Sequence, residues 1–106
     1  MSRVQRGEIW WLEEPHRKAR PVCVLTRESA IPVVTQLTVI PATSRARGIP
    51  TEVDLTTADG MPKPCVLTTD NILTVPKSYL TRKITRLHPS RMREICSALA
   101  IATGCS

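Results

Sequence analysis

The sequence predicts a small, mainly β protein that ends in one helix, and three observations support this class. Short runs rich in β-branched and aromatic residues recur at roughly ten-residue spacing over the first three-quarters of the chain. Stretches with proline or glycine separate these runs, and the last segment changes to a helical period. Because 106 residues suit one domain, residues 1–106 are expected to form a single small barrel of the SH3-like or OB type.

The expected strands are short segments whose apolar residues are either continuous or alternate with polar ones. Val53 and Leu55, for example, alternate with acidic residues, which is typical of a strand with one buried face. The segment 58–64 contains a glycine and two prolines and is expected to be a loop. The candidate strands are 7–13, 20–26, 35–43, 50–56, one or two strands within 65–75, and 83–87.

The segment 88–104, HPSRMREICSALAIATG, predicts an amphipathic helix. Pro89 or Ser90 can begin it and Gly104 can end it, since proline suits a first helical turn and glycine suits the position after the last. His88 is expected at the start of this helix. The predicted apolar stripe consists of Met92, Ile95, Cys96 and Leu99.

The chain is basic, with 15 Lys+Arg against 9 Asp+Glu and a net charge of +6. A basic, arginine-rich chain favours a nucleic acid, an anionic surface or an acidic protein as its partner, although a solvated surface explains charge alone. No targeting leader is visible and no apolar run approaches ~18 residues. We therefore expect a cytoplasmic protein without a membrane partner.

The four cysteines lie singly and far apart, without the close ligand pairs that a structural zinc site uses. No metal and no cofactor is therefore expected. Cys23 and Cys65 lie in apolar runs and Cys96 lies on the apolar stripe of the helix, so these cysteines are expected to be buried free thiols. Cys105 lies close to the C-terminus.

A series of stretches resembles, in its order and spacing, the MazF/PemK (Kid-like) toxin family. The stretches are RGEIWWLE, ARPVCVLT, LTVIPATS with GIPTEVDL, TDNILTV and LTRKITRL, and they extend from about Arg6 to the terminal helix. The resemblance implies an SH3-like barrel, a homodimer and a metal-independent endoribonuclease that acts as the toxin of a toxin–antitoxin pair. The implied partners are RNA and a MazE-like antitoxin with an acidic C-terminal tail.

The same resemblance supplies candidate catalytic residues. The key arginine of the family corresponds to Arg20, at the head of the RPV strand, and its key threonine corresponds to Thr43, at the end of VIPATS. Some members use an aspartate that matches Asp70 in TTDN, and some have a histidine in the first loop, where His16 lies.

The segment around this aspartate departs from the family. Relatives often carry an arginine two residues before it and another three residues after it, whereas this chain has Thr68 and Leu73. Arg45 and Arg47, in the loop after the key threonine, can replace that charge from another direction. Together with Arg17, Lys18 and Arg27 they are expected to bind RNA phosphates without reading sequence.

Metal-free RNA cleavage requires the 2′-hydroxyl to attack the adjacent phosphorus. One group must accept the 2′ proton, one must stabilise the phosphorane, and one must protonate the departing 5′ oxygen. Arg20 suits the phosphorane and the leaving oxygen, Thr43 suits a neutral hydrogen bond, and Asp70 or His16 can accept the proton. The expected products carry a 2′,3′-cyclic phosphate and a 5′-hydroxyl.

Each candidate also has a purely structural alternative. Arg20 can be a strand-edge cation, Thr43 and Asp70 can stabilise turns, and His16 can be a solvated loop residue. At the level of function, the alternatives are a CcdB-like gyrase poison without nuclease activity and a non-catalytic nucleic-acid-binding barrel.

Two further features lie outside the catalytic candidates. Trp10 and Trp11 must point to opposite faces of their strand, so one is expected in the core and the other at a dimer interface. The stretch 77–93, KSYLTRKITRLHPSRMR, contains six cations and no acid, and it suggests a second basic face.

Overall fold

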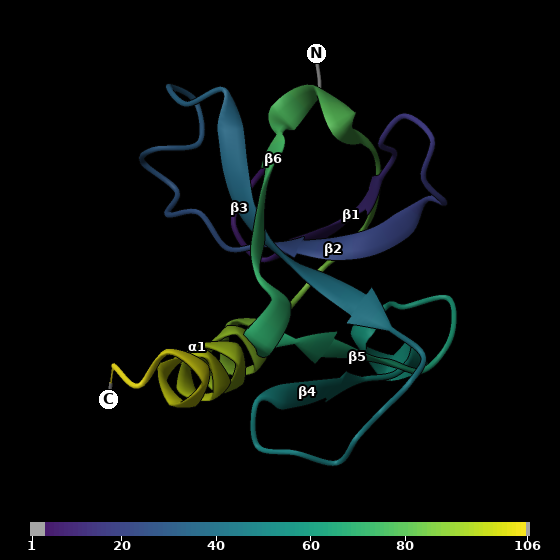
Figure 1. Ribbon diagram of the computed structural model, residues 1–106, viewed down its shortest axis with the longest axis vertical. Coiled ribbons are helices and arrows are strands. Elements are labelled where there is room, and N and C mark those ends of the chain that lie inside the picture. The colour runs from purple at the N-terminus through teal and green to yellow at the C-terminus, as the bar shows by residue number, and fades with distance from the viewer. Residues whose placement is uncertain (1–3, 106) are drawn as a thin grey trace.

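The computed structural model describes residues 4–105, which form one antiparallel sheet, three short 3₁₀ turns and a C-terminal helix (Figure 1). This architecture confirms the predicted fold class. The strands are β1 (Glu8–Leu12), β2 (Arg20–Val24), β3 (Gln36–Thr43), β4 (Glu52–Leu55), β5 (Cys65–Thr68), β6 (Leu73–Pro76) and β7 (Leu80–Arg86). The turns are η1 (Thr57–Asp59), η2 (Thr69–Asn71) and η3 (Lys77–Tyr79), and the helix is α1 (Pro89–Thr103).

Strand β3 is the centre of the sheet because it pairs with three other strands. Its first part pairs with β6 and its middle with β2, whereas its last two residues pair with β5. The path through the sheet runs β4-β5-β3-β2-β1-β7, with β6 as a branch on β3. Within residues 4–105 the sheet curls without closing into a continuous ring. The two ends of β3 therefore belong to different parts of the molecule (Figure 1).

Two hydrophobic cores lie on opposite faces of the sheet, as alternation along the strands requires. Trp10 and Leu12 of β1 point into the first core, whereas Ile9 points into the second. The prediction that one tryptophan is buried is thus confirmed for Trp10, which is 5% exposed; Trp11 is half-buried. The first core fills the curl of the sheet, and the second lies between the sheet, β4–β5 and α1.

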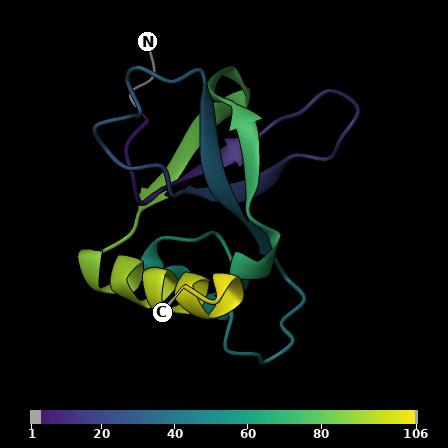
Figure 2. The ribbon, with the colours of Figure 1, turned by 60° about the vertical axis from the view of Figure 1, so that its left-hand side comes forward.

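Helix α1 lies across one end of the sheet (Figure 2) and begins and ends near its predicted bounds. The Nδ1 atom of His88 accepts a hydrogen bond from the Ser90 backbone at 3.1 Å, so His88 is the N-cap, and Gly104 is the C-cap at φ 69°. The buried face of the helix is formed by Ile95 and Ala98.

The predicted burial of Cys96 is wrong. The helix turns about 100° per residue, so with Ile95 facing the core the Cys96 side chain points to the margin of the helix and is exposed. There its sulfur accepts a hydrogen bond from the Arg6 guanidinium at 3.3 Å. Of the other cysteines, Cys23 is buried as predicted and Cys65 is half-buried.

The segments between strands contain more structure than the sequence indicated. The expected loop at 58–64 begins inside η1, which Thr56 and Asp59 close with reciprocal hydrogen bonds to the backbone. The segment 65–75 forms two strands, β5 and β6, with η2 between them. Strand β7 begins three residues earlier than predicted, because the whole of it pairs with β1.

Among the described residues, one carboxylate is buried. Glu8 is only 2% exposed and accepts hydrogen bonds from the Trp10 indole at 2.9 Å and the Gln5 backbone at 2.8 Å, with Lys83 at 3.1 Å. Desolvation raises the pKa of Glu8, but these three partners outweigh it and hold the pKa below its ordinary value of 4.5. The ionised carboxylate therefore joins the chain before β1 to β1 and β7.

Candidate active site

A pocket of about 650 Å³ opens where the last residues of β3 leave β2 for β5. It contains five of the residues that the sequence singled out: Arg20, Thr43, Arg45, Arg47 and Asp70. They come from β2, β3, the loop that follows β3, and η2. The remaining lining residues are Pro41, Ala42, Ile49, Glu52, Thr68, Asn71 and Leu73.

Arg20 and Thr43 lie at the ends of neighbouring antiparallel strands. Val22 of β2 is opposite Pro41 of β3, which is the last pair between these two strands. Arg20 lies two residues before Val22, and Thr43 lies two residues after Pro41, where β3 pairs with β5. Both residues line the pocket. The point where β3 leaves β2 for β5 therefore brings the guanidinium and the hydroxyl to one cavity.

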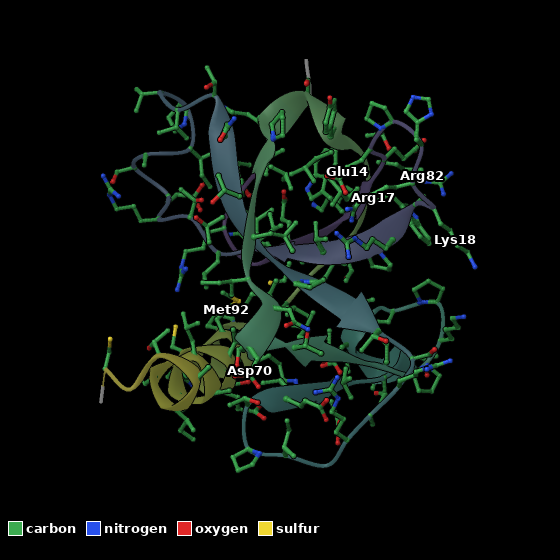
Figure 3. The ribbon with its side chains drawn as sticks, viewed as in Figure 1. Glu14, Arg17, Lys18, Asp70, Arg82 and Met92 are labelled. Carbon is green, nitrogen blue, oxygen red and sulfur yellow. The ribbon has the colours of Figure 1, made fainter. Side chains whose placement is uncertain are left out.

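The Arg20 guanidinium is partly neutralised by a carboxylate that sequence reasoning missed. Its Nη2 atom lies 3.6 Å from Oε1 of Glu14, with the Arg20 side chain 34% exposed. Glu14 belongs to the loop between β1 and β2 (Figure 3). The ion pair is loose and open to solvent, so an incoming phosphate can compete with Glu14 for the guanidinium.

The Thr43 hydroxyl stabilises a turn and remains able to bind a ligand. Its Oγ1 atom accepts a hydrogen bond from the Arg45 backbone at 3.2 Å, which is the structural role that the sequence left open. A hydroxyl has one hydrogen to donate as well as lone pairs to accept. Because accepting from the backbone leaves that hydrogen free, Thr43 can still donate to a phosphate oxygen in the pocket.

Asp70 is held at the wall of the pocket by a short hydrogen bond. Oγ1 of Thr51 donates to its Oδ2 atom at 2.5 Å. The backbone carbonyl of Thr51 in turn accepts from the Thr69 hydroxyl at 2.6 Å and from the Thr69 backbone at 3.1 Å. The carboxylate is therefore fixed by contacts between η2 and the residue before β4. Thr51 had no signal in the sequence, since these residues are distant along the chain.

The loop that contains Arg45 and Arg47 is anchored by an acid of β4. Oε1 of Glu52 accepts hydrogen bonds from the backbone of Arg47 at 2.8 Å and of Gly48 at 3.0 Å. The two arginine side chains are exposed. A loop that is held in place by Glu52 and that exposes two guanidinium groups beside a pocket suits an anionic ligand.

The other predicted residues lie around or away from this pocket. Arg17 and Lys18 line a second, shallow hollow together with Arg20, so they extend the cationic surface along the β1–β2 loop (Figure 3). His16 is exposed in the same loop at φ 63° and lines neither hollow. Arg27 follows the opposite end of β2 and is not brought together with the others.

Thr68 and Leu73, where the family often has arginine, both line the pocket. Their positions therefore belong to the site, although in this chain the two side chains contribute no charge. Among residues 4–105, no group of three or more His, Cys, Asp or Glu side chains is arranged to hold a metal ion.

Comparison with known proteins gives consistent matches over nearly the whole chain. Residues 5–103 match the profile described as "PemK-like, MazF-like toxin of type II toxin-antitoxin system". The chain is 39% identical over 103 residues to the probable endoribonuclease MazF2 of Mycobacterium tuberculosis, covering 96% of this chain and 100% of that protein. It is 40% identical over 85 residues to the endoribonuclease MazF3 of the same species, covering 80% and 82% of the two chains.

Solved structures show the same fold. The M. tuberculosis toxin MazF-mt6 superposes with a TM-score of 0.85 at 35% identity, covering 93% of this chain and 98% of that one. A mycobacterial endoribonuclease in complex with its cognate antitoxin has a TM-score of 0.88 at 24% identity, covering 98% of each chain. At that identity the second comparison supports the fold alone.

Proposed function

The chain belongs to the PemK-like, MazF-like toxin family of type II toxin–antitoxin systems, and we propose from the site that it cleaves RNA through the pocket framed by Arg20 and Thr43. The observation that carries the proposal is that one pocket is lined by an arginine at the start of β2, a threonine at the end of β3 and two exposed arginines of the following loop. Relatives at 39–40% identity are endoribonucleases by name. An anionic, flexible substrate such as single-stranded RNA suits an open basic pocket.

In the proposed reaction the ribose 2′-oxygen forms a bond to phosphorus as the bond from phosphorus to the 5′-oxygen breaks. Arg20 binds two non-bridging oxygens in place of Glu14 and stabilises the charge of the phosphorane. Thr43 donates its free hydroxyl hydrogen to the same phosphate. Asp70, oriented by Thr51, accepts the 2′ proton. Arg20 protonates the leaving 5′-oxygen, so the products carry a 2′,3′-cyclic phosphate and a 5′-hydroxyl.

The proposed assembly follows from the same family membership. Residues 1–106 act as one toxin domain, two copies form a homodimer, and an antitoxin with an acidic tail blocks the basic pocket. Charge complementarity with Arg45 and Arg47 supports an acidic occupant. The proposal places the protein in the cytoplasm, with its RNA. In the part of the chain that the structure describes, no helix has the length and apolar character that spanning a membrane requires.

Cleavage assays on single-stranded RNA in EDTA test the proposal. We expect 5′-hydroxyl ends at the same rate with and without chelator, because Arg20 rather than a metal ion stabilises the phosphorane. Arg20→Ala should reduce the rate by about 100-fold or more. Arg93→Ala is the matched control, since it removes an exposed arginine of α1 that does not line the pocket.

Four results would contradict the proposal. Full activity of Arg20→Ala would rule out the proposed mechanism, and loss of cleavage in EDTA that a divalent ion restores would indicate a metal-dependent one. A folded wild-type protein that binds RNA without cutting it would instead indicate a non-catalytic binding barrel, and growth arrest through gyrase without RNA cleavage would indicate a gyrase poison.

A further inference from the structure

The basic strand β7 carries an arginine that stands over a half-buried tryptophan. The Cζ atom of Arg82 lies 5.8 Å from the centroid of the Trp11 ring, a cation–π geometry. Arg82 itself is exposed and Trp11 is not fully covered by protein. Among the described residues, no salt bridge of Arg82 with an acid is found. The guanidinium is therefore a planar cation that is exposed to solvent and lies over an aromatic ring.

The pairing of the strands places this stack close to the proposed active site. Arg82 of β7 is opposite Trp11 of β1, and Trp11 is opposite Pro21 of β2, the residue that follows Arg20. Neighbouring strands are about 4.8 Å apart, so two strand spacings, about 10 Å, separate the Arg82 backbone from β2. Because side chains alternate along β2, Arg20 and the Trp11–Arg82 stack lie on opposite faces of the sheet.

The β1–β2 loop joins these two faces around the edge of the sheet. Arg17 and Lys18 are exposed in this loop, and together with Arg20 they line a shallow hollow. The loop is tied to the beginning of β7, because the Glu13 backbone donates to the Tyr79 carbonyl at 2.9 Å and the Thr81 hydroxyl donates to Glu13 at 2.5 Å. Figure 3 shows Arg17, Lys18 and Arg82 on the right-hand side of the upper half of the molecule. Cationic side chains therefore lead from the pocket around the loop to Arg82.

We propose that Arg82, supported by Trp11, is a stacking platform for an unpaired base of the bound RNA, outside the pocket where the chain is cut. This inference rests on the proposed function, because it assumes that RNA leaves the pocket over Arg17 and Lys18. Unpaired bases stack on arginine planes and aromatic rings, and such stacking tolerates every base because each has a π-face. The platform therefore adds affinity for long RNA without adding a sequence requirement.

The charges on this surface favour RNA over a second copy of the chain. In a symmetric dimer the same patch meets itself, so an interface centred on Trp11 would bring Arg82, Arg17 and Lys18 close to their own copies. Like charges brought together in this way oppose association. RNA supplies both components that the surface matches, a base for the stacked guanidinium and phosphates for the loop.

The test measures binding to a fully 2′-O-methyl RNA of mixed sequence and about twelve nucleotides, which spans a typical single-strand site. This probe lacks the attacking 2′-hydroxyl, so binding is separated from cleavage. Arg82→Ala and Arg82→Lys should each weaken binding by about 5–10-fold, since either change removes the planar group. Arg82→Lys keeps the charge, so the slope of log Kd against log salt should match that of the wild type.

Arg86→Ala is the matched control on the same strand. It removes one exposed cation whose Nη1 atom contacts Gln5 rather than an aromatic ring, and it should weaken binding by less than about 2-fold. Trp11→Leu should resemble Arg82→Ala, and Trp11→Phe should restore part of the affinity. On long RNA, the Arg82 variants should raise KM and leave kcat unchanged, because the platform does not touch the reacting phosphate.

Three outcomes would overturn the inference. The first is wild-type binding by both Arg82 variants. The second is that Arg82→Lys binds the probe as tightly as the wild type, while Arg82→Ala and Arg86→Ala lose affinity equally. That result would mean that only the charge of Arg82 contributes to binding. The third is dissociation of a dimer by the Arg82 variants in size-exclusion chromatography, which assigns the surface to an interface between copies. A wild-type protein that binds the probe but cuts no RNA would remove the proposed function and leave the platform to be judged by these binding data.

Discussion

At the scale of single residues, the cysteines show how the fold gives chemically identical thiols different reactivities. Burial raises the pKa of the Cys23 thiol to about 12, and the nearby Arg6 and Cys96 alter this value less. Desolvation, with a contribution from Asp59, also raises the pKa of the half-buried Cys65. Cys96 and Cys105 are exposed. Because the thiolate is the reactive form, the four thiols should differ strongly in reactivity.

We predict that iodoacetamide at pH 8 labels Cys96 and Cys105 of the native protein quickly, Cys65 slowly, and Cys23 only after unfolding. Buried and protonated, Cys23 lacks both access and thiolate character. Peptide mass spectrometry over a time course measures each rate, and the same reaction in denaturant provides the control in which all four react. Labelling of Cys23 at the rate of Cys96 in the folded protein would contradict its burial.

At the scale of elements, one arginine joins the helix to the second half of the sheet. The Nε atom of Arg91 lies 3.1 Å from Oδ1 of Asp59 in η1, and its Nη1 atom contacts Glu94 of the helix at 2.6 Å. Its Nη2 atom donates to the Asp54 carbonyl of β4. Arg91 thus connects α1, η1 and β4 through one planar group whose side chain is 22% exposed.

We predict that Arg91→Ala lowers the free energy of unfolding by about 1–3 kcal/mol, because it leaves the charge-assisted hydrogen bonds of Asp59 and Asp54 without a donor. Arg93→Ala, two residues along the helix, should change stability by less than about 0.5 kcal/mol, since Arg93 is exposed. Urea unfolding followed by circular dichroism compares the two variants. Equal stabilities would mean that hydrophobic packing alone holds α1 to β4.

At the scale of the whole molecule, the net charge of +6 is unevenly distributed. Cations gather at the pocket and along the β1–β2 loop, whereas the groove between α1 and β4 contains Glu52, Asp54, Asp59 and Glu94 with Arg91. The electrostatic field of this charge distribution guides an anionic partner to the side of the molecule that contains the pocket. Both RNA and an acidic antitoxin tail are expected to follow it.

We predict that reversing Arg45 and Arg47 together, to glutamate, slows association of RNA and of the antitoxin in parallel. For single-stranded RNA, losing two phosphate contacts should reduce the slope of log affinity against log salt by about 1.4. Stopped-flow association across a salt series measures the effect. Reversal of Arg86 and Arg93 is the control, because it changes the net charge equally at exposed sites outside the pocket. Loss of RNA binding with intact antitoxin binding would show that the inhibitor docks elsewhere.

Much of the fold was predictable because it depends on local order along the chain. The alternation of Val53 and Leu55 with acids predicted β4, and the helical spacing with its proline and glycine predicted α1 to within a residue at each end. The exposure of Cys96 was not predictable in this way, since helical spacing defines an apolar stripe but not which of its residues face the core. The packing of Ile95 and Ala98 against the sheet determines it, and the exposed sulfur then contacts Arg6, ninety positions away in sequence.

Some residues of the candidate site were likewise predictable from the sequence, and others only from the tertiary structure. The order of the chain and its resemblance to a family were enough to select Arg20, Thr43 and Asp70, because each lies at a recognisable strand end or turn. Only the fold brought them to one pocket, since the antiparallel register of β2 with β3 and the switch of β3 to β5 join distant segments. Glu14 beside Arg20 and Thr51 beside Asp70 also depend on the fold. Side-chain periodicity is local, whereas pairing between strands is a property of the folded chain, and only pairing determines which side chains meet.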